Sequence, residues 1–190
     1  MKQIPHQSNT HGTPRSGGDK WVIGTGGKGK NGTARAICLI ALRDPKDRVS
    51  VDNVEALEAR YDCLYVRNCS GLTVTNSHFD RAGRNIFSIV GNANRFIFSG
   101  CYFGSYWGLY HSDIEPNKGR WAKNGLIVNC VFDGRKGGKR WGKMFTFSGM
   151  GDRETNNITV LDCLFQQLMV RIRGCFPGSS SFTMILRPRD

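Results

Sequence analysis

The sequence lacks long apolar runs and any segment that resembles a secretory leader. No stretch of its 190 residues approaches the roughly 18 uninterrupted apolar residues of a membrane-spanning helix, so we expect no membrane partner. The start, Met1-Lys-Gln-Ile-Pro-His-Gln-Ser, carries a positive charge but no apolar run and no small-residue cleavage pattern after it. We therefore expect the chain to stay in the cytoplasm as synthesised.

The sequence also lacks Cys and His residues at the spacing of metal ligands. Its acidic residues are too few to balance its basic residues. The seven cysteines form no Cys-x-x-Cys pair, and no His-rich cluster accompanies them. We expect no metal site and interpret them as reduced, buried thiols. The 27 Lys and Arg residues exceed the 15 Asp and Glu residues by 12. This net charge favours acidic partners: nucleic acid, anionic lipid or acidic polysaccharide.

One short pattern recurs along the chain and indicates a repeat architecture. It consists of two apolar residues two positions apart, then Asn, Gly or Asp, then a small residue, any residue and Phe. The anchor residues of the pattern are Asn53, Asn76, Gly100, Asn129 and Asp162, and their spacings are 23, 24, 29 and 33 residues. The copy at Asn53 is the weakest because it lacks the Phe. A unit of this length is too short to contain a helix.

The pattern predicts two short strands joined by a sharp bend. Apolar residues two apart favour a strand, because side chains alternate across it. Asn, Gly and Asp tolerate left-handed backbone angles best, so we place the bend at the anchors. After each bend a small residue and a Phe point to the same side. Stacked units would then form an internal column of small residues, Ser77, Cys101, Cys130 and Cys163, and another of aromatic rings, Phe79, Phe103, Phe132 and Phe165.

A third strand is visible in each unit, so each coil has three. We call the strand before the bend the second, the strand after it the third, and the remaining one the first. First strands are expected at 63–66, 86–90, 110–114, 144–147 and 168–172. The predicted fold is all-β, a parallel solenoid of about six coils with three short strands each, over residues 36–190. Residues 1–35, rich in Gly, Ser and Lys, are interpreted as a partial cap or loop.

These features resemble the right-handed parallel β-helix family, the pectate-lyase-like superfold that includes phage tailspikes and polysaccharide-degrading enzymes. The most specific pieces are the Asn-(Ser/Cys)-x-Phe repeat and the segment Trp107-Gly-Leu-Tyr-His-Ser-Asp113-Ile-Glu115-Pro116-Asn117. The second is similar to a Gly-Ile-Asp-Ile-Glu-Pro-Asn stretch of such proteins. The resemblance implies polysaccharide binding along the first-strand sheet. It also implies a possible homotrimer, and a place on the virion if the chain is a phage protein.

Two insertions are expected to flank the first-strand sheet. They cover residues 115–124 and 133–143 and share a short sequence, Arg120-Trp121-Ala-Lys123 and Arg140-Trp141-Gly-Lys143. An exposed indole can stack on a sugar ring, and the neighbouring cations can pair with carboxylate or sulfate groups. We therefore predict substrate binding by these six residues. The alternative is that both tryptophans fold back and cover the edge of the coil.

The expected groove floor carries His111, Asp113 and Glu115, which are spaced two apart and so share one strand face. If Ile114 is buried, all three face outward and are candidate catalytic residues. Carboxylates at i and i+2 have Cα atoms roughly 6.5–7 Å apart, which suits either hydrolytic geometry. They would act as general acid and base, or bind a Ca²⁺ ion that bridges a uronate. The alternative is a solvated face, or carboxylates that bond only the local backbone and Lys118.

A lyase would use a different set of residues. It needs a cation to neutralise the uronate carboxylate and a base to remove the adjacent proton. Arg171 and Arg173 lie two apart in a later first strand and, with Lys143, would form a cationic end of the groove. The polygalacturonase motifs of the family are absent, and no pectate-lyase arginine motif is present, so neither specific activity is supported.

The sequence favours a protein that binds, or binds and cleaves, an acidic polysaccharide. The alternative is a structural or adhesive β-helix without activity, such as part of a tail fibre, because one fold hosts both. Nucleic acid is a disfavoured partner. Tryptophan stacks on bases as well as on sugars, but no nucleic-acid motif accompanies the two Arg-Trp-x-Lys segments.

Overall fold

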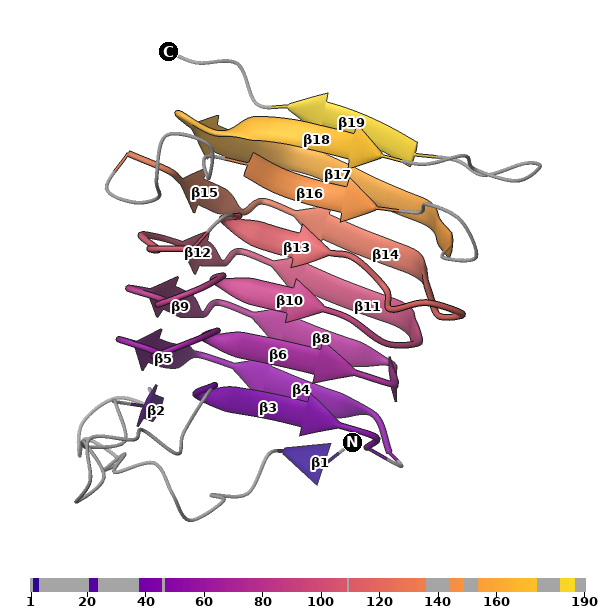
Figure 1. Ribbon diagram of the computed structural model, residues 1–190. Helices are drawn as coiled ribbons and strands as arrows, with labels where there is room; N and C mark the ends of the chain where they lie inside the picture. Colours follow the sequence, from indigo (N-terminus) through magenta and orange to yellow (C-terminus); the bar gives the residue numbers. More distant parts are fainter. Residues whose placement is uncertain are drawn as a thin grey trace.

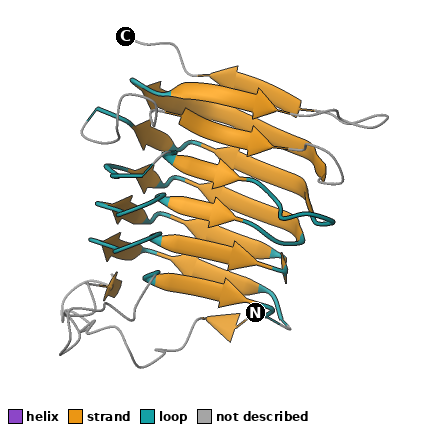
Figure 2. Cartoon of the chain, in the orientation of Figure 1, coloured by secondary structure: helices purple, strands orange, loops and turns teal. Residues whose placement is uncertain are grey.

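The computed structural model is a solenoid of stacked parallel strands (Figures 1 and 2). The structure describes residues 2–3, 21–23, 38–45, 47–108, 110–135, 144–148, 154–173 and 182–186. Within this part of the chain every regular element is a β-strand. Each strand pairs in parallel with the equivalent strand one coil away, and the chain rises as a right-handed coil.

The first strands form a six-stranded sheet, the first sheet. Its order along the solenoid is β3 (Ile40–Arg43), β6 (Leu64–Arg67), β10 (Phe87–Ile89), β13 (Ser112–Ile114), β16 (Met144–Ser148) and β18 (Met169–Arg173). All five predicted first strands are present, and β3 adds one before them. Six strands are separated by five turns, so the described solenoid has about five turns rather than the expected six.

The second and third sheets complete each coil and enclose the common core with the first sheet. The second sheet contains β1 (Lys2–Gln3), β4 (Val49–Asp52), β8 (Leu72–Thr75), β11 (Ala93–Ser99), β14 (Trp121–Val128), β17 (Glu154–Gln166) and β19 (Phe182–Leu186), with β7 (Cys69–Ser70) beside β11. The third sheet contains β2 (Trp21–Ile23), β5 (Val54–Leu57), β9 (His78–Asp80), β12 (Tyr102–Phe103) and β15 (Val131–Asp133). Strand β17 runs through the bend into the third sheet and joins the two.

The bends between the second and third strands lie at the predicted anchors. Asn53, Asn76, Gly100, Asn129 and Asp162 all have positive φ angles, between 48° and 63°. This left-handed conformation is costly for most residues and is tolerated best by Gly, Asn and Asp. The anchor residue types in the sequence therefore mark the corners of the coil.

The core confirms the two predicted internal columns. Phe79, Phe103, Phe132 and Phe165 stack ring on ring, with centroid distances of 5.5, 4.8 and 4.7 Å between successive coils. The small residues of the other column, Ser77, Cys101, Cys130 and Cys163, are buried. The cysteines at 38, 63, 69, 101, 130 and 163 are free thiols, and all except Cys38 are buried. Cys175 lies outside the described residues.

At the N-terminal end, β1 pairs with β4 and β2 pairs with β5. These short strands add one strand to the N-terminal edge of the second sheet and one to that of the third sheet. The division at residue 35 into a cap and a solenoid stays a prediction.

Candidate functional site

The outer face of the first sheet carries a column of mostly polar side chains, one from each strand. The register aligns Ala41, Tyr65, Ser88, Asp113, Thr146 and Arg171. Their chain neighbours Phe87, Ile89 and Ile114 point into the core and are fully buried. The column therefore points outward, because side chains alternate across a strand.

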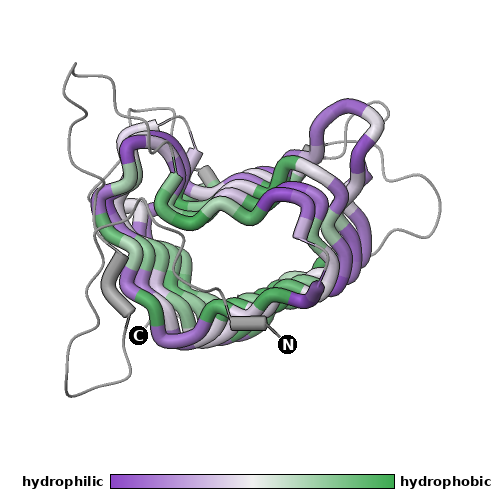
Figure 3. The backbone as a smooth tube through the Cα atoms, turned by 90° about the horizontal axis from the view of Figure 1, so that it is seen from below, coloured by the Kyte–Doolittle hydropathy of each residue, from purple (hydrophilic) through white to green (hydrophobic). Residues whose placement is uncertain are grey.

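The middle of this outer face is recessed. Ser88, Asp113 and Thr146 are exposed by only 0, 9 and 2%, although they point away from the core. Viewed along the solenoid, the trace of the coil curves inward on one side between two groups of protruding connections (Figure 3). These three side chains are therefore not part of a solvated strand face.

An ion pair stands at the edge of the recess where the first strands begin. Arg84 binds both carboxylate oxygens of Asp62, which is fully buried. The Asp62 carboxylate also accepts a hydrogen bond from the backbone N–H of Asn85 at 3.2 Å. The Asn85 amide and the Arg84 guanidinium both donate to Ser88 Oγ, at 3.0 and 3.4 Å. The pair thus connects this edge to the floor of the recess.

We expect Arg84→Ala to lower the free energy of unfolding by about 3 kcal/mol. The truncation leaves the buried Asp62 carboxylate without its cation; half of the Arg84 side chain is exposed, which places the loss at the lower end for buried pairs. Urea denaturation at pH 7 measures the change. The double variant Asp62→Asn, Arg84→Gln should recover part of the loss, and equal losses in both variants would contradict this assignment.

The predicted carboxylates Asp113 and Glu115 both lie on the first-sheet side of β13 and its continuation. Asp113 occupies the centre of the recess, between Ser88 and Thr146. Glu115 follows the strand and is half-buried, and its backbone N–H donates to Ile89 O at 3.1 Å. The expectation that Asp113 faces outward while Ile114 is buried is confirmed.

The expectation that His111 faces outward is wrong. Its ring is fully buried and contacts the rings of Tyr106 and Phe132. Nε2 lies 3.0 Å from Phe103 O, and Nδ1 lies 3.0 Å from Ser112 Oγ. Strand β13 begins only at Ser112, so the alternation does not extend back to residue 111, where the chain is still turning out of the preceding connection.

The burial of His111 predicts that the folded protein becomes less stable as the pH falls. Desolvation lowers the pKa of His111 from 6.5 to about 4, against smaller opposing effects of Phe103 O, Gly104, Asp133 and Asp80. The unfolded chain binds this proton more readily, so the stabilisation is complete above pH 6.5 and is lost as the pH falls towards 4. Between pH 7 and 5 we expect a loss of about 2 kcal/mol.

The measurement is urea unfolding at pH 7 and pH 5, for the parent and for His111→Gln. The variant lacks the titrating ring, so its stability should change less between the two pH values. An equal change in both proteins would show that other groups cause the acid sensitivity.

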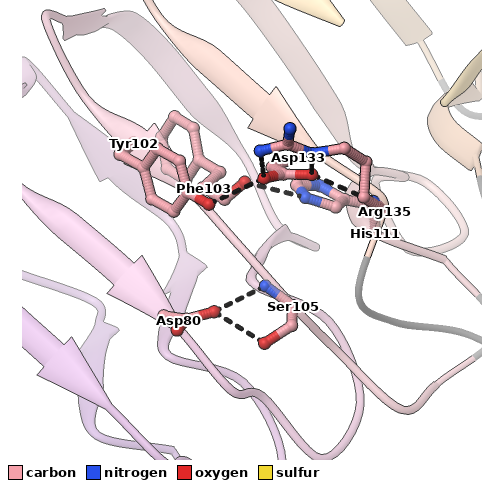
Figure 4. A network of polar contacts seen from close by, with 7 residues as sticks. All are labelled: Asp80, Tyr102, Phe103, Ser105, His111, Asp133 and Arg135. Carbon is pink, nitrogen blue, oxygen red and sulfur yellow. Dashed lines mark hydrogen bonds and ion pairs between the residues drawn. The ribbon is translucent and has the colours of Figure 1, made fainter. Parts of the chain in front are cut away.

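Around His111, a polar network connects residues of the third sheet and of the connections that lead to the first sheet (Figure 4). The side chain of Asp133 is buried, accepts two hydrogen bonds from the Arg135 guanidinium at 2.9 and 2.7 Å, and accepts one from Tyr102 Oη at 2.9 Å. The Arg135 guanidinium is the main cause that lowers the pKa of Asp133 to about 2. One coil below, Asp80 Oδ1 accepts from the backbone N–H and the hydroxyl of Ser105. The carboxylates of Asp133 and Asp80 therefore have structural roles.

The first insertion is shorter than expected. The connection ends at Arg120, and Trp121 and Lys123 belong to β14, where Ala122 between them is fully buried and pairs with Ala93. Trp121 is half-buried, with Lys123 Nζ 5.6 Å from its ring centroid. Lys123 pairs with Glu154 at 2.6 Å and lowers the pKa of that carboxyl. This arrangement favours the alternative in which Trp121 covers the edge of the coil.

The remaining predicted binding residues divide into those that the structure places and those that it does not. Arg120 is exposed at the end of the connection that follows β13. Arg171 is half-buried in the outward column of the first sheet, two strands from Asp113. The backbone of Arg173 lies in β18, and its side chain is outside the description. Arg140, Trp141 and Lys143 also lie outside the described residues.

Two exposed aromatic residues near the recess were not predicted as site residues. Trp107 is 76% exposed and Tyr61 is 43% exposed. Both lie in connections between the third and first sheets, where strand alternation gives no guide to orientation. Trp107 belongs to the segment that carries the family resemblance, but only the three-dimensional structure shows that its indole is free.

The part of the chain that the structure describes contains neither a metal-binding cluster nor a membrane-spanning helix. No group of three or more His, Cys, Asp or Glu side chains in this part of the chain could hold a metal ion. The same residues contain no helix long and apolar enough to cross a membrane.

The sequence matches no protein-family model and no curated protein sequence. Among solved structures it is similar to a tailspike protein of Acinetobacter baumannii bacteriophage Fri1, a capsular polysaccharide depolymerase, with a TM-score of 0.57 and 22% identity. The similarity covers 73% of this chain and 26% of the tailspike, so the chain spans about a quarter of that protein's length. At this identity the likeness shows the fold, and the chain is a right-handed parallel β-helix of the kind found in phage tailspikes.

Proposed function

We propose that this protein is a carbohydrate-active β-helix module that binds an acidic polysaccharide along the outer face of the first sheet. The observation that carries this proposal is the recessed polar column of Ser88, Asp113 and Thr146. Thr146 Oγ1 is buried and has no hydrogen-bond partner among the described residues. A sugar hydroxyl that reaches Thr146 Oγ1 on binding would supply the missing hydrogen bond and offset the desolvation of this group.

Charge supports an acidic ligand. The chain carries an excess of 12 positive charges, and Arg171 and Arg84 stand at either side of Asp113 along the face. Cationic groups beside a recess attract anionic chains, and guanidinium groups bind carboxylates in a defined geometry. The similar tailspike, described as a capsular polysaccharide depolymerase, supports the same class of ligand. A virion location and a homotrimer belong to this proposal as well.

Cleavage by this face would use Asp113 and Glu115. In hydrolysis one carboxyl protonates the leaving oxygen while the other activates water or attacks the anomeric carbon. In elimination Arg171 would neutralise the uronate carboxylate, and one of the two carboxylates would remove the neighbouring proton. The products differ: elimination leaves an unsaturated uronate that absorbs in the ultraviolet, whereas hydrolysis leaves only a new reducing end.

The test is incubation of the purified protein with uronate-containing and neutral polysaccharides. Ultraviolet absorbance and reducing ends are followed together, with and without Ca²⁺, and binding is measured in parallel at low and high salt. Cleavage of an acidic chain supports an active site and identifies the reaction. Salt-sensitive binding without cleavage supports a binding module. Absence of both would overturn the proposal in favour of a structural β-helix.

A further inference from the structure

Four exposed side chains form a surface beside the recess, and we call it the edge ledge: Arg60, Tyr61, Arg84 and Trp107. All four lie in connections that lead from the third sheet to the first sheet, in three successive coils. Their backbones stack in register. Arg84 N–H donates to Tyr61 O at 2.9 Å, Trp107 N–H donates to Ala82 O at 2.9 Å, and Gly108 N–H donates to Arg84 O at 3.1 Å.

This register places the ledge residues in two neighbouring columns. One column contains Tyr61, Arg84 and Gly108, and the other contains Arg60, Gly83 and Trp107. Aromatic rings and guanidinium groups thus alternate along the edge, and the Arg84 guanidinium carbon lies 5.8 Å from the Tyr61 ring centroid.

Gly83 lies one coil below Trp107 in the same column. A Cβ atom there would lie 1.9 Å from Arg60 O, so the close backbone stacking requires glycine. In the next coil of this column, Trp107 is 76% exposed. An exposed, flat apolar ring of this size can stack on the face of a sugar ring.

Arg84 connects the ledge to the recess. The buried Asp62 carboxylate fixes the guanidinium, which is 43% exposed, so one side of the group is held while another faces solvent. The pKa of Arg84 is raised, first by its hydrogen bond to Asp62 and to a smaller extent by Asp113. The guanidinium also donates to Ser88 Oγ. A ligand on the ledge would therefore lie beside the outward column that contains Asp113.

We propose that the edge ledge binds an anionic sugar residue of the polysaccharide, with its ring stacked on Trp107 or Tyr61 and its acidic group paired with Arg84 and Arg60. This inference rests on the proposed function and adds a subsite that selects acidic sugars. Alternating rings and cations suit a pyranose with a carboxylate. Carboxylates in the adjoining face, Asp113 and Glu115, can bond the sugar hydroxyls of such a chain.

The test measures binding of oligogalacturonate, alginate and hyaluronate fragments, of methyl-esterified oligogalacturonate and of a single-stranded oligothymidylate. We expect Trp107→Ala and Tyr61→Ala each to weaken binding of the preferred acidic fragment by about tenfold, or about 1.4 kcal/mol. Methyl esterification should weaken binding to the parent protein by a similar factor. Ile97→Ala is the matched control, because Ile97 is exposed on the second sheet and should leave affinity unchanged.

The outcomes separate the ledge from the wider proposal. Trp107 is exposed, so its truncation should leave the unfolding temperature unchanged, and a loss of binding would not reflect misfolding. Unchanged binding of an acidic fragment by both aromatic variants would overturn the ledge and leave the proposed function standing. Binding of no fragment would overturn both. Preferred binding of oligothymidylate or of the methyl ester would show that the ledge does not select acidic sugars.

Discussion

Phe132→Ala should lower the free energy of unfolding by about 4 kcal/mol. Phe132 is fully buried at the centre of the aromatic column, with ring centroids 4.8 Å from Phe103, 4.7 Å from Phe165 and 5.0 Å from Phe145. Its truncation removes contacts to the coils above and below, and the rigid strands on each side cannot close the cavity. Denaturant unfolding monitored by circular dichroism measures the loss.

Two controls accompany this variant. Phe132→Leu keeps most of the side-chain volume and should cost less than half as much as the alanine. Ile97→Ala removes an apolar side chain of the second sheet that is 36% exposed, and it should have a small effect. A similar loss in all three variants would show that the aromatic column contributes no more than any other apolar contact.

For a protein that cleaves an acidic polysaccharide, we expect Asp113→Asn with Glu115→Gln to reduce turnover by ~10²-fold or more, because general acid and base catalysis contributes ~10²–10⁴-fold. The amides keep the shape of the carboxylates but cannot transfer protons. Binding of the polysaccharide should persist, since the aromatic and guanidinium groups of the ledge are unchanged. The measurement follows reducing ends and ultraviolet absorbance with the polysaccharide identified by the panel.

The matched control is Glu55→Gln, which removes a carboxylate from β5 in the third sheet. It should leave turnover unchanged. Each single variant, Asp113→Asn and Glu115→Gln, then shows which carboxyl contributes more. Full turnover by the double variant would remove both residues from the mechanism and direct attention to the connections that follow the third strands.

The fold could be predicted from the sequence because its repeat reflects two structural constraints, one on the backbone and one on side-chain packing. Asn, Gly or Asp occupies the bend anchors, where φ is positive, and Phe recurs where the coils stack. Both constraints recur once per coil, so Asn76, Asn129 and the phenylalanines that follow them mark corners and core without an alignment. The described residues form about five turns, close to the six coils that the spacing predicts.

The candidate site was predictable only where it lies on a strand. Asp113 follows the alternation of β13, and its outward position was predicted correctly. His111 lies one residue before that strand, where the chain turns and alternation does not apply. Trp107 and Arg84 lie in connections whose geometry depends on stacking with neighbouring coils, through hydrogen bonds such as that from Gly108 N–H to Arg84 O. Such contacts between coils leave no periodic trace in the sequence.

The unequal spacing of the bends indicates that the connections around the recess can vary in length. Successive anchors are separated by 23, 24, 29 and 33 residues, yet the strands stay in register from coil to coil. Closing a 33-residue turn rather than a 23-residue one costs only about 0.3 kcal/mol of loop entropy. Residues can therefore be added to the connections around the first sheet almost without loss of stability, whereas the stacked interior tolerates few changes. Ligand preference can thus diversify through loop length while the solenoid stays the same.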